Sequence, residues 1–318
     1  MKLIITIDTE EDNWARYDTT DNPVENIKRV AVLQKLFDQY NIRPTYLVSY
    51  PVATNPHSVG ILRQILADGK CEIGMHCHPW NTPPFEEEIS DINSMLSNLP
   101  ESLVWKKLKV LHEAIGENFD TVPVSFRAGR WGFRASVARS LCKLGYRVDT
   151  SVTPFLNWRE YHGPDFSDFH MSPYRFDPND IAVPNNKGAL LEIPVTIGFL
   201  QKNIERCRRW TNYAEMNIGK KLHLKGILDR LGLLNKVWLS PELADTKSMI
   251  KLAERVESMN VPCLNMSFHS TSLMAGLSPL VASRKEEALF MEKMKGFLTH
   301  AVESGWKSIL LKEFATKP

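Results

Sequence analysis

Two histidines stand at the end of a short apolar run in the stretch Cys71–Trp80, CEIGMHCHPW. The run predicts a buried strand that stops at Pro79. Because side chains alternate between the two faces of a strand, His76 and His78 should point one way and Cys77 the other. Two converging imidazoles suit a divalent transition metal such as zinc. Taken alone, the pair could also be two half-exposed histidines at a strand end without a metal.

Similar apolar runs alternate with helical patterns over most of the chain. The expected strands are 3–8, 44–49, 72–76, 124–127, 146–149, 262–268 and 308–311. The expected helices lie near 22–40, 57–67, 86–98, 101–118, 133–145, 249–256 and 283–301. A capping box marks the beginning of two helices, Asn22 with Glu25 and Ser283 with Glu286.

This alternation of strands and helices with short connections implies parallel strands joined by right-handed crossovers. The number of such units favours an α/β barrel over an open sheet. The whole chain, 1–318, is expected to form one domain. Within it, 154–245 breaks the alternation and is interpreted as an insertion, with short strands near 181–183 and 189–195.

The composition is that of an ordinary soluble globular protein. Of 318 residues, 43% are apolar, and 39 Lys and Arg nearly balance 37 Asp and Glu. This balance indicates no nucleic-acid partner, and the glycines form no nucleotide-binding pattern. Five scattered cysteines without a Cys-x-x-Cys pair fit reduced thiols. No signal peptide or membrane-spanning run is visible, so a cytoplasmic location is expected.

Ionisable residues gather where the expected strands end. Besides the two histidines they are Asp8, Glu10, Arg127, Asp149 and His269. Ligands of parallel α/β folds bind at the carboxyl ends of the strands, so these side chains should meet at one face. Taken singly, each could be a loop, turn, ion-pair or core residue. Their joint placement is what indicates a functional site.

The first part of this site is a predicted metal centre. Asp8 and Glu10 should share one face of their strand, so one carboxylate could ligate the metal and the other act as a base. Which carboxylate does which stays open at this point. His76, His78 and a carboxylate would leave positions free for water, as a catalytic zinc site requires.

The remaining strand-end residues predict acid–base chemistry. Arg127 could orient the basic carboxylate, and Asp149 could anchor Arg127 or a histidine in turn. His269 could protonate a leaving amine, which would make this a site of metal-assisted amide hydrolysis. Trp80 and Trp131 follow two of the motifs and could stack on a sugar ring, or could be core or rim tryptophans.

The order of these motifs resembles the polysaccharide deacetylase (NodB-homology) family of carbohydrate esterases. Thr6–Glu10 resembles the family's first motif, with Asp8 at the position of the base. Thr9 stands where the family places its metal-ligating carboxylate, so Glu10 is the candidate ligand. Gly74–Trp80 matches a subgroup with Gly-x-His-x-His-Pro-Trp in place of the usual His-x-x-x-His.

The other three motifs follow in the family's order. Arg127 alone matches the third motif, because Gly129-Arg130-Trp131 stands where Pro-Tyr is expected. Asp149–Ser151 resembles the fourth motif, and Ser267–Ser270 resembles the fifth, whose histidine is the general acid. The resemblance implies a distorted (β/α)7 barrel of the NodB-homology type, here with the insertion between the fifth strand and the C-terminal units.

Three functions are compatible with these residues. The resemblance implies a metal-dependent hydrolase, with zinc as the expected metal, that removes an N-acetyl group from a sugar. The substrate would be a polysaccharide or a lipid-linked or nucleotide-linked intermediate of surface-glycan assembly. The alternatives are a metal-dependent hydrolase of a non-sugar amide and a non-catalytic glycan-binding protein on the same fold.

Overall fold

Seven parallel strands form the centre of the computed structural model, which describes residues 1–14, 16–215 and 233–315. Their order in the sheet is β11 (Cys263–His269), β1 (Lys2–Thr9), β2 (Thr45–Val48), β3 (Glu72–Cys77), β4 (Ser125–Ala128), β5 (Val148–Asp149) and β8 (Leu190–Glu192). From β1 to β5 each strand pairs with the next along the chain, which is the order of a barrel of βα units.

The two end strands, β8 and β11, are joined by individual hydrogen bonds in place of a regular ladder. The Thr196 N–H donates to the Asn265 carbonyl oxygen at 2.9 Å. The Asn265 side-chain amide donates to the Ile193 carbonyl oxygen at 3.1 Å. These bonds bring the segment after β8 alongside β11. The predicted distorted barrel is therefore observed, and its distortion lies at this seam.

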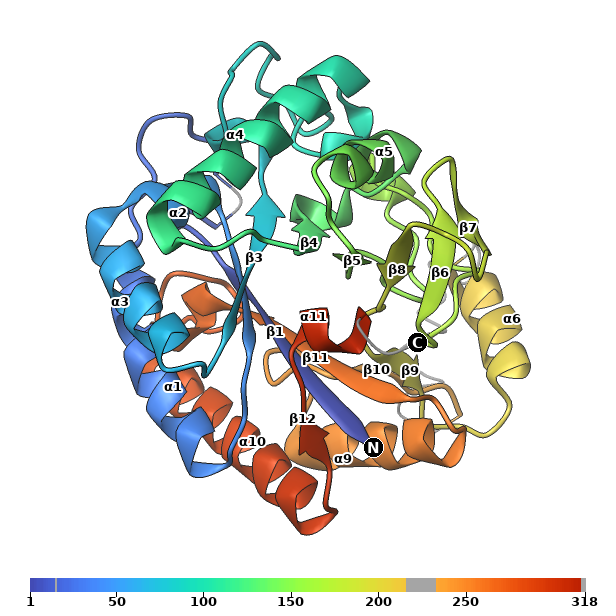
Figure 1. The fold of residues 1–318 in the computed structure, drawn as a ribbon. Coiled ribbons are helices and arrows are strands. Elements are labelled where there is room, and N and C mark those ends of the chain that lie inside the picture. Colours follow the sequence, from blue (N-terminus) through green and yellow to red (C-terminus); the bar gives the residue numbers. More distant parts are fainter. Residues whose placement is uncertain (15, 216–232, 316–318) are drawn as a thin grey trace.

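Helices surround the strands, as Figure 1 shows. They are α1 (Val30–Gln39), α2 (Tyr50–Thr54), α3 (Pro56–Ala67), α4 (Glu101–Phe119), α5 (Ala135–Lys143), α6 (Ile204–Glu215), α9 (Thr246–Ser258), α10 (Arg284–Glu303) and α11 (Leu311–Ala315). The capping box of Ser283 and Glu286 at the start of α10 is confirmed. None of the helices in the described ranges is both long enough and apolar enough to cross a membrane.

Two helical predictions are wrong. Asn22 caps no helix: the chain enters a 3-10 helix at Glu25, and the Asp12 carboxylate accepts the N–H groups of Glu25 and Asn26. The segment 86–98 forms turns with one short 3-10 helix at its end. There the Ser90 hydroxyl accepts the Asn93 N–H, a local bond that competes with helix formation.

The segment 154–245 contains more of the barrel than the sequence indicated, because it supplies β8. The rest of its described part is peripheral. β6 (Tyr174–Asp177) and β7 (Asp180–Pro184) form an antiparallel hairpin at the sheet edge. β9 (Ile197–Phe199) and β10 (Lys236–Trp238) form a separate antiparallel pair. The segment also contains α6, and residues 216–232 lie outside the described residues.

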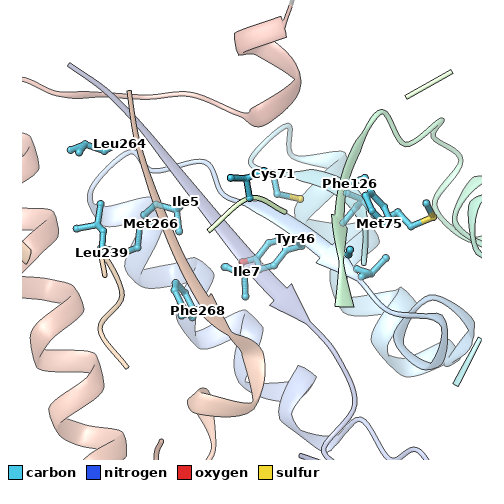
Figure 2. Packing of buried hydrophobic residues seen from close by; sticks show 14 of the residues in the cluster. Ile5, Ile7, Tyr46, Cys71, Met75, Phe126, Leu239, Leu264, Met266 and Phe268 are labelled. Carbon is cyan, nitrogen blue, oxygen red and sulfur yellow. The ribbon is translucent and has the colours of Figure 1, made fainter. Parts of the chain in front are cut away.

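Side chains alternate between the inside of the barrel and its helical shell. Ile5 and Ile7 of β1 point outward and pack in the main core, where Figure 2 shows them with Met266 and Phe268 of the neighbouring β11. Ile4 points inward, into a small apolar cluster with members from β2, β5, β8 and β11. Leu311 of α11 completes that cluster.

This inner cluster closes one end of the barrel. The Leu311 N–H donates to the Thr45 hydroxyl, and the Lys312 N–H donates to the Glu72 carboxylate at the beginning of β3. Thr45 and Glu72 stand at the beginnings of their strands, so α11 covers the amino-terminal end. The carboxyl ends of the strands are left free to form a site.

Candidate metal and catalytic site

A cavity of about 400 Å³ opens at the carboxyl ends of the strands. Acidic and imidazole side chains from β1, β3 and β11 and from the segments after β1, β3 and β10 form part of its lining: Asp8, Glu10, Glu11, His76, His78, Glu242 and His269. Tryptophan and tyrosine side chains form another part: Trp14, Tyr17, Trp80, Trp131, Trp158, Tyr161 and Trp238. This is the face on which parallel α/β folds bind ligands.

Glu10, His76 and His78 converge inside this cavity. The Glu10 Oε2 atom lies 3.4 Å from His76 Nε2 and 3.5 Å from His78 Nε2. The ligand atoms of all three lie within 4.8 Å of one another, and all three residues are buried. Cys77 points into the outer core, as strand alternation predicts. Of the two carboxylates left open by the sequence, the structure brings Glu10 to the histidines.

These three residues fit a divalent metal. Ligand atoms held about 2.0–2.1 Å from one tetrahedral ion lie about 3.3 Å apart, close to the observed spacing. A contact at Nδ1 orients each ring so that Nε2 faces Glu10. His76 Nδ1 donates to the Arg127 carbonyl oxygen at 3.1 Å, and His78 Nδ1 lies 2.9 Å from Glu11 Oε1. Burial and nearby carboxylates raise the pKa of Glu10 to about 8. A cation bound beside Glu10 would favour the ionised carboxylate and so offset this effect.

Gly129 makes room for one of the rings. A Cβ atom at this position would lie 2.2 Å from His78 Cδ2 and 2.7 Å from the Cys77 carbonyl oxygen. Both contacts are far shorter than real Cβ atoms allow, so a larger residue would displace the imidazole. Gly129 is therefore required for the observed position of the His78 ring beside Glu10 and His76.

Asp8 faces Arg127, not the histidine pair. Arg127 Nη1 donates to Asp8 Oδ1 at 2.6 Å, and Arg127 is fully buried. Burial alone would raise the pKa of Asp8, but the charges of Arg127, His76 and His269 more than offset it and leave that pKa below its usual range. The guanidinium is held in turn by the hydroxyl groups of Thr6 and Thr150. Asp8 is thus an ionised, oriented carboxylate.

His269 also lines the cavity, on the strand next to that of Asp8. Its Nε2 atom is 3.8 Å from Asp8 Oδ2, and its Nδ1 atom is 3.1 Å from Glu242 Oε2. Glu242 also accepts the backbone N–H of His269. Burial would lower the pKa of His269, but the charges of Glu242, Glu10 and Asp8 outweigh it and raise the pKa to about 10. The imidazole is therefore protonated at neutral pH.

Sequence reasoning missed Glu242, and no spacing signal would have found it. It stands 27 residues before His269, in the segment between β10 and α9, and only the fold brings the two together. It also missed Glu11, which is buried against His78. Trp158 and Trp238 were not singled out either, although both line the cavity.

Asp149 is the one predicted site residue on the wrong side of the barrel. It pairs in register with Phe126, which points into the outer core, and the preceding Val148 points into the barrel. Asp149 therefore turns away from the cavity and binds the Ser151 hydroxyl at 2.7 Å. Thr150, one residue later, points inward and takes the place that Asp149 was expected to fill beside Arg127.

Trp80 and Trp131, the two predicted stacking residues, differ in how accessible their rings are to a ligand. Trp80 is only 7% exposed and stacks on His78, with ring centroids 4.2 Å apart and planes at 19°. Its ring therefore supports a metal ligand. Trp131 packs 5.4 Å from Trp238, over the Arg127 guanidinium, and both indoles line the cavity. These two indoles form an aromatic wall of the cavity.

No protein-family model matches the chain, and no curated protein matches it. A solved structure from Parabacteroides distasonis, provisionally described as a glycoside hydrolase/deacetylase, has a TM-score of 0.55 at 12% identity, over 99% of this chain and 70% of that one. The 4-alpha-glucanotransferase of Thermococcus litoralis has a TM-score of 0.53 at 11% identity, over 100% of this chain and 40% of its own. A likeness at these identities establishes the fold, an α/β barrel, and does not establish an activity.

A third solved structure, from Mycobacterium smegmatis, is provisionally described as a polysaccharide deacetylase. It has a TM-score of 0.48 at 16% identity, over 100% of this chain and 94% of that one.

Proposed function

We propose that this protein is a metal-dependent hydrolase that removes an N-acetyl group from a sugar. The observation that carries the proposal is that one cavity holds both a set of candidate metal ligands and a separate acid–base pair. Glu10, His76 and His78 converge on one point, while Asp8 and His269 stand beside it with opposite charges. A charged base and a charged acid facing one metal site are what amide hydrolysis requires.

Glu10, His76 and His78 would hold the metal. A divalent ion bound there, zinc by the preference of two imidazole ligands, would polarise the acetyl carbonyl as a Lewis acid. All three ligands are buried, so their attraction to the metal would be screened little by bulk solvent. Holding the acetyl group between these residues and His269 supplies the orientation on which such catalysis depends.

Asp8 is the proposed general base. Arg127 keeps the carboxylate ionised through a bond of 2.6 Å, so it is ready to accept a proton at neutral pH. It would take that proton from the water that attacks the acetyl carbon. Thr150 and Thr6 fix the guanidinium and so act as positioning residues.

His269 is the proposed general acid. Its pKa of about 10 means that Nε2 carries a proton at neutral pH. It would donate that proton to the amide nitrogen as the C–N bond breaks, releasing acetate and the amino sugar. Glu242 orients the ring at Nδ1 and stabilises the imidazolium, so it is a positioning residue.

The aromatic walls favour a sugar over other amides. Trp131, Trp238 and Trp14 present rings to the cavity, and flat apolar faces of this kind stack on the C–H faces of pyranose rings. The fold shared with a protein described as a glycoside hydrolase/deacetylase supports the same choice. The expected partner is thus a glycan or a small molecule that carries an N-acetyl sugar.

The test is acetate release from a panel of N-acetylated sugars, oligosaccharides and lipid-linked or nucleotide-linked sugars, with non-sugar amides alongside. Asp8→Asn should lower kcat/KM by about 10²–10⁴-fold, because it removes the base and keeps the shape. Asp120→Asn is the matched control, since Asp120 is exposed and its left-handed backbone suits asparagine. Hydrolysis of only non-sugar amides would contradict the sugar assignment, and sugar binding without turnover would indicate a glycan-binding protein.

A further inference from the structure

Two consecutive carboxylates meet the two nitrogens of one imidazole. Glu10 Oε2 lies 3.5 Å from Nε2 of His78, and Glu11 Oε1 lies 2.9 Å from Nδ1 of the same ring. Glu11 is 3% exposed, and its other oxygen accepts a hydrogen bond from the fully buried Ser49 hydroxyl at 3.1 Å. Nothing in the hydrolytic scheme uses Glu11 or Ser49.

We infer that Glu11 is a positioning residue that strengthens metal binding by fixing His78, an inference that rests on the metal site of the proposed function. A carboxylate has no proton to give, so Nδ1 of His78 must be the donor. Nε2 then presents its lone pair toward Glu10 and His76. A carboxylate behind a ligating imidazole also makes that imidazole a stronger donor.

The ring of His78 has no freedom to turn away from this arrangement. Trp80 stacks on one face with centroids 4.2 Å apart. Gly129 lies against the Cδ2 edge so closely that no Cβ atom would fit. Glu11, anchored by Ser49, holds the remaining edge. Three separate segments of the chain therefore set one orientation.

His76 provides an internal comparison. Its Nδ1 donates to a neutral acceptor, the Arg127 carbonyl oxygen at 3.1 Å, whereas Nδ1 of His78 meets a carboxylate. The two ligands are therefore unequal, and His78 is the stronger one. Glu11 also adds a negative charge beside the metal site. This charge would attract a cation and would partly cancel the repulsion from Arg127, which is paired with Asp8.

The first test measures Zn²⁺ affinity without any activity assay. The full-length protein is stripped with a chelator and titrated with Zn²⁺ against a chromophoric competitor. Glu11→Gln should weaken binding by about 10–100-fold, because the amide keeps the shape but loses the charge. Ser49→Ala should weaken it less, because the carboxylate stays. Glu117→Gln, the same change on an exposed helical residue, should leave the affinity unchanged.

The second test uses the unaltered protein, so it stands even if Glu11→Gln does not fold. Nitrogen-15 NMR of histidine-labelled, Zn²⁺-loaded protein should show His78 protonated at Nδ1 and metal-bound through Nε2. Metal bound through Nδ1, or wild-type affinity in Glu11→Gln, would overturn the role of Glu11 and leave the proposed hydrolase intact. A wild-type protein that binds no divalent metal would overturn both.

Discussion

Each end of the barrel buries a carboxylate, Glu72 at the beginning of β3 and Glu10 directly after β1, and the two carboxylates have different partners. At the closed end, Glu72 accepts hydrogen bonds from the Thr45 and Ser125 hydroxyls and from the Lys312 N–H. At the open end, within the described residues, Glu10 Oε2 approaches only the Nε2 atoms of two histidines. Burial raises the pKa of both groups, but only Glu72 has its hydrogen bonds made.

This difference separates a structural carboxylate from one that is prepared for a cation. A buried polar group costs free energy unless it is paired, and three donors meet that need at Glu72. The Glu10 carboxylate faces imidazoles in place of such donors, so positive charge near it, from His269 or from a bound cation, offsets the cost of its burial. Glu72 is thus hydrogen-bonded within the fold under α11, whereas Glu10 faces two histidines at the cavity.

The largest effect on turnover should come from the acid at the open end. His269→Gln should lower kcat by about 10²–10⁴-fold, because glutamine cannot protonate the leaving amine. Zn²⁺ affinity should remain, since His269 is not one of the three converging ligands. Single-turnover kinetics and metal titration check the two parts. Unchanged turnover would remove His269 from the mechanism.

The pH at which His269 loses its proton should depend on the charge of Glu242. The pKa of His269 in the folded protein, about 10, lies above the ordinary value of about 6.5. A raised pKa means that the resulting stability is complete below about pH 6.5 and is lost as the pH rises through about 10. The alkaline limb of kcat/KM should likewise follow the loss of the proton from His269, above the ordinary range of a histidine.

Glu242→Gln removes the largest favourable charge, so that limb should move toward neutral pH. The variant should also lose most Tm relative to the wild type near pH 6 and least near pH 10. Glu117→Gln should do neither, because Glu117 is exposed on α4. An alkaline limb that stays in place would show that Glu242 does not control the imidazolium.

A smaller effect is expected from the glycine beside His78. Gly129→Ala should weaken Zn²⁺ binding about tenfold or more, because the added Cβ would lie 2.2 Å from the ring. Gly60→Ala is the control, since nothing lies within 4 Å of a Cβ there and alanine favours the helix. Equal affinities in the two variants would mean that the ring tolerates displacement.

The smallest effect on chemistry should come from the closed end. Glu72→Gln should lower the free energy of unfolding by about 1–3 kcal/mol, because the amide cannot accept all three hydrogen bonds. Metal affinity and kcat should stay at wild-type values. Denaturant unfolding and metal titration measure the two. A loss of metal binding without a loss of stability would contradict a purely structural role for Glu72 at the closed end of the barrel.

Strand periodicity explains which parts of the site were predictable. One rule of alternation placed His76 and His78 together, turned Cys77 away, and put Asp8 and Glu10 on one face. These contacts depend on residues two apart on regular strands, so the sequence holds the information. The strand ends then predicted that Arg127 and His269 would approach, because parallel strands finish at one edge.

The errors arose where alternation was not applied or where contacts are long-range. The position of Asp149 at a strand end predicts that it lies in the cavity. Its register partner Phe126 packs in the outer core, so Asp149 faces outward. Glu242 reaches His269 through a segment without periodicity, so only the folded chain defines the contact. Asp12 caps a helix 13 residues later, a distance beyond any local capping pattern.

The most direct measurement is the metal content of the purified protein beside that of His76→Ala. The wild type should contain about one equivalent of a divalent metal, because three buried ligands converge on one point. The variant should contain none, while circular dichroism shows the fold retained. A wild type without metal after reconstitution with Zn²⁺, or a variant that binds as much, would contradict the metal centre on which the proposed hydrolysis depends.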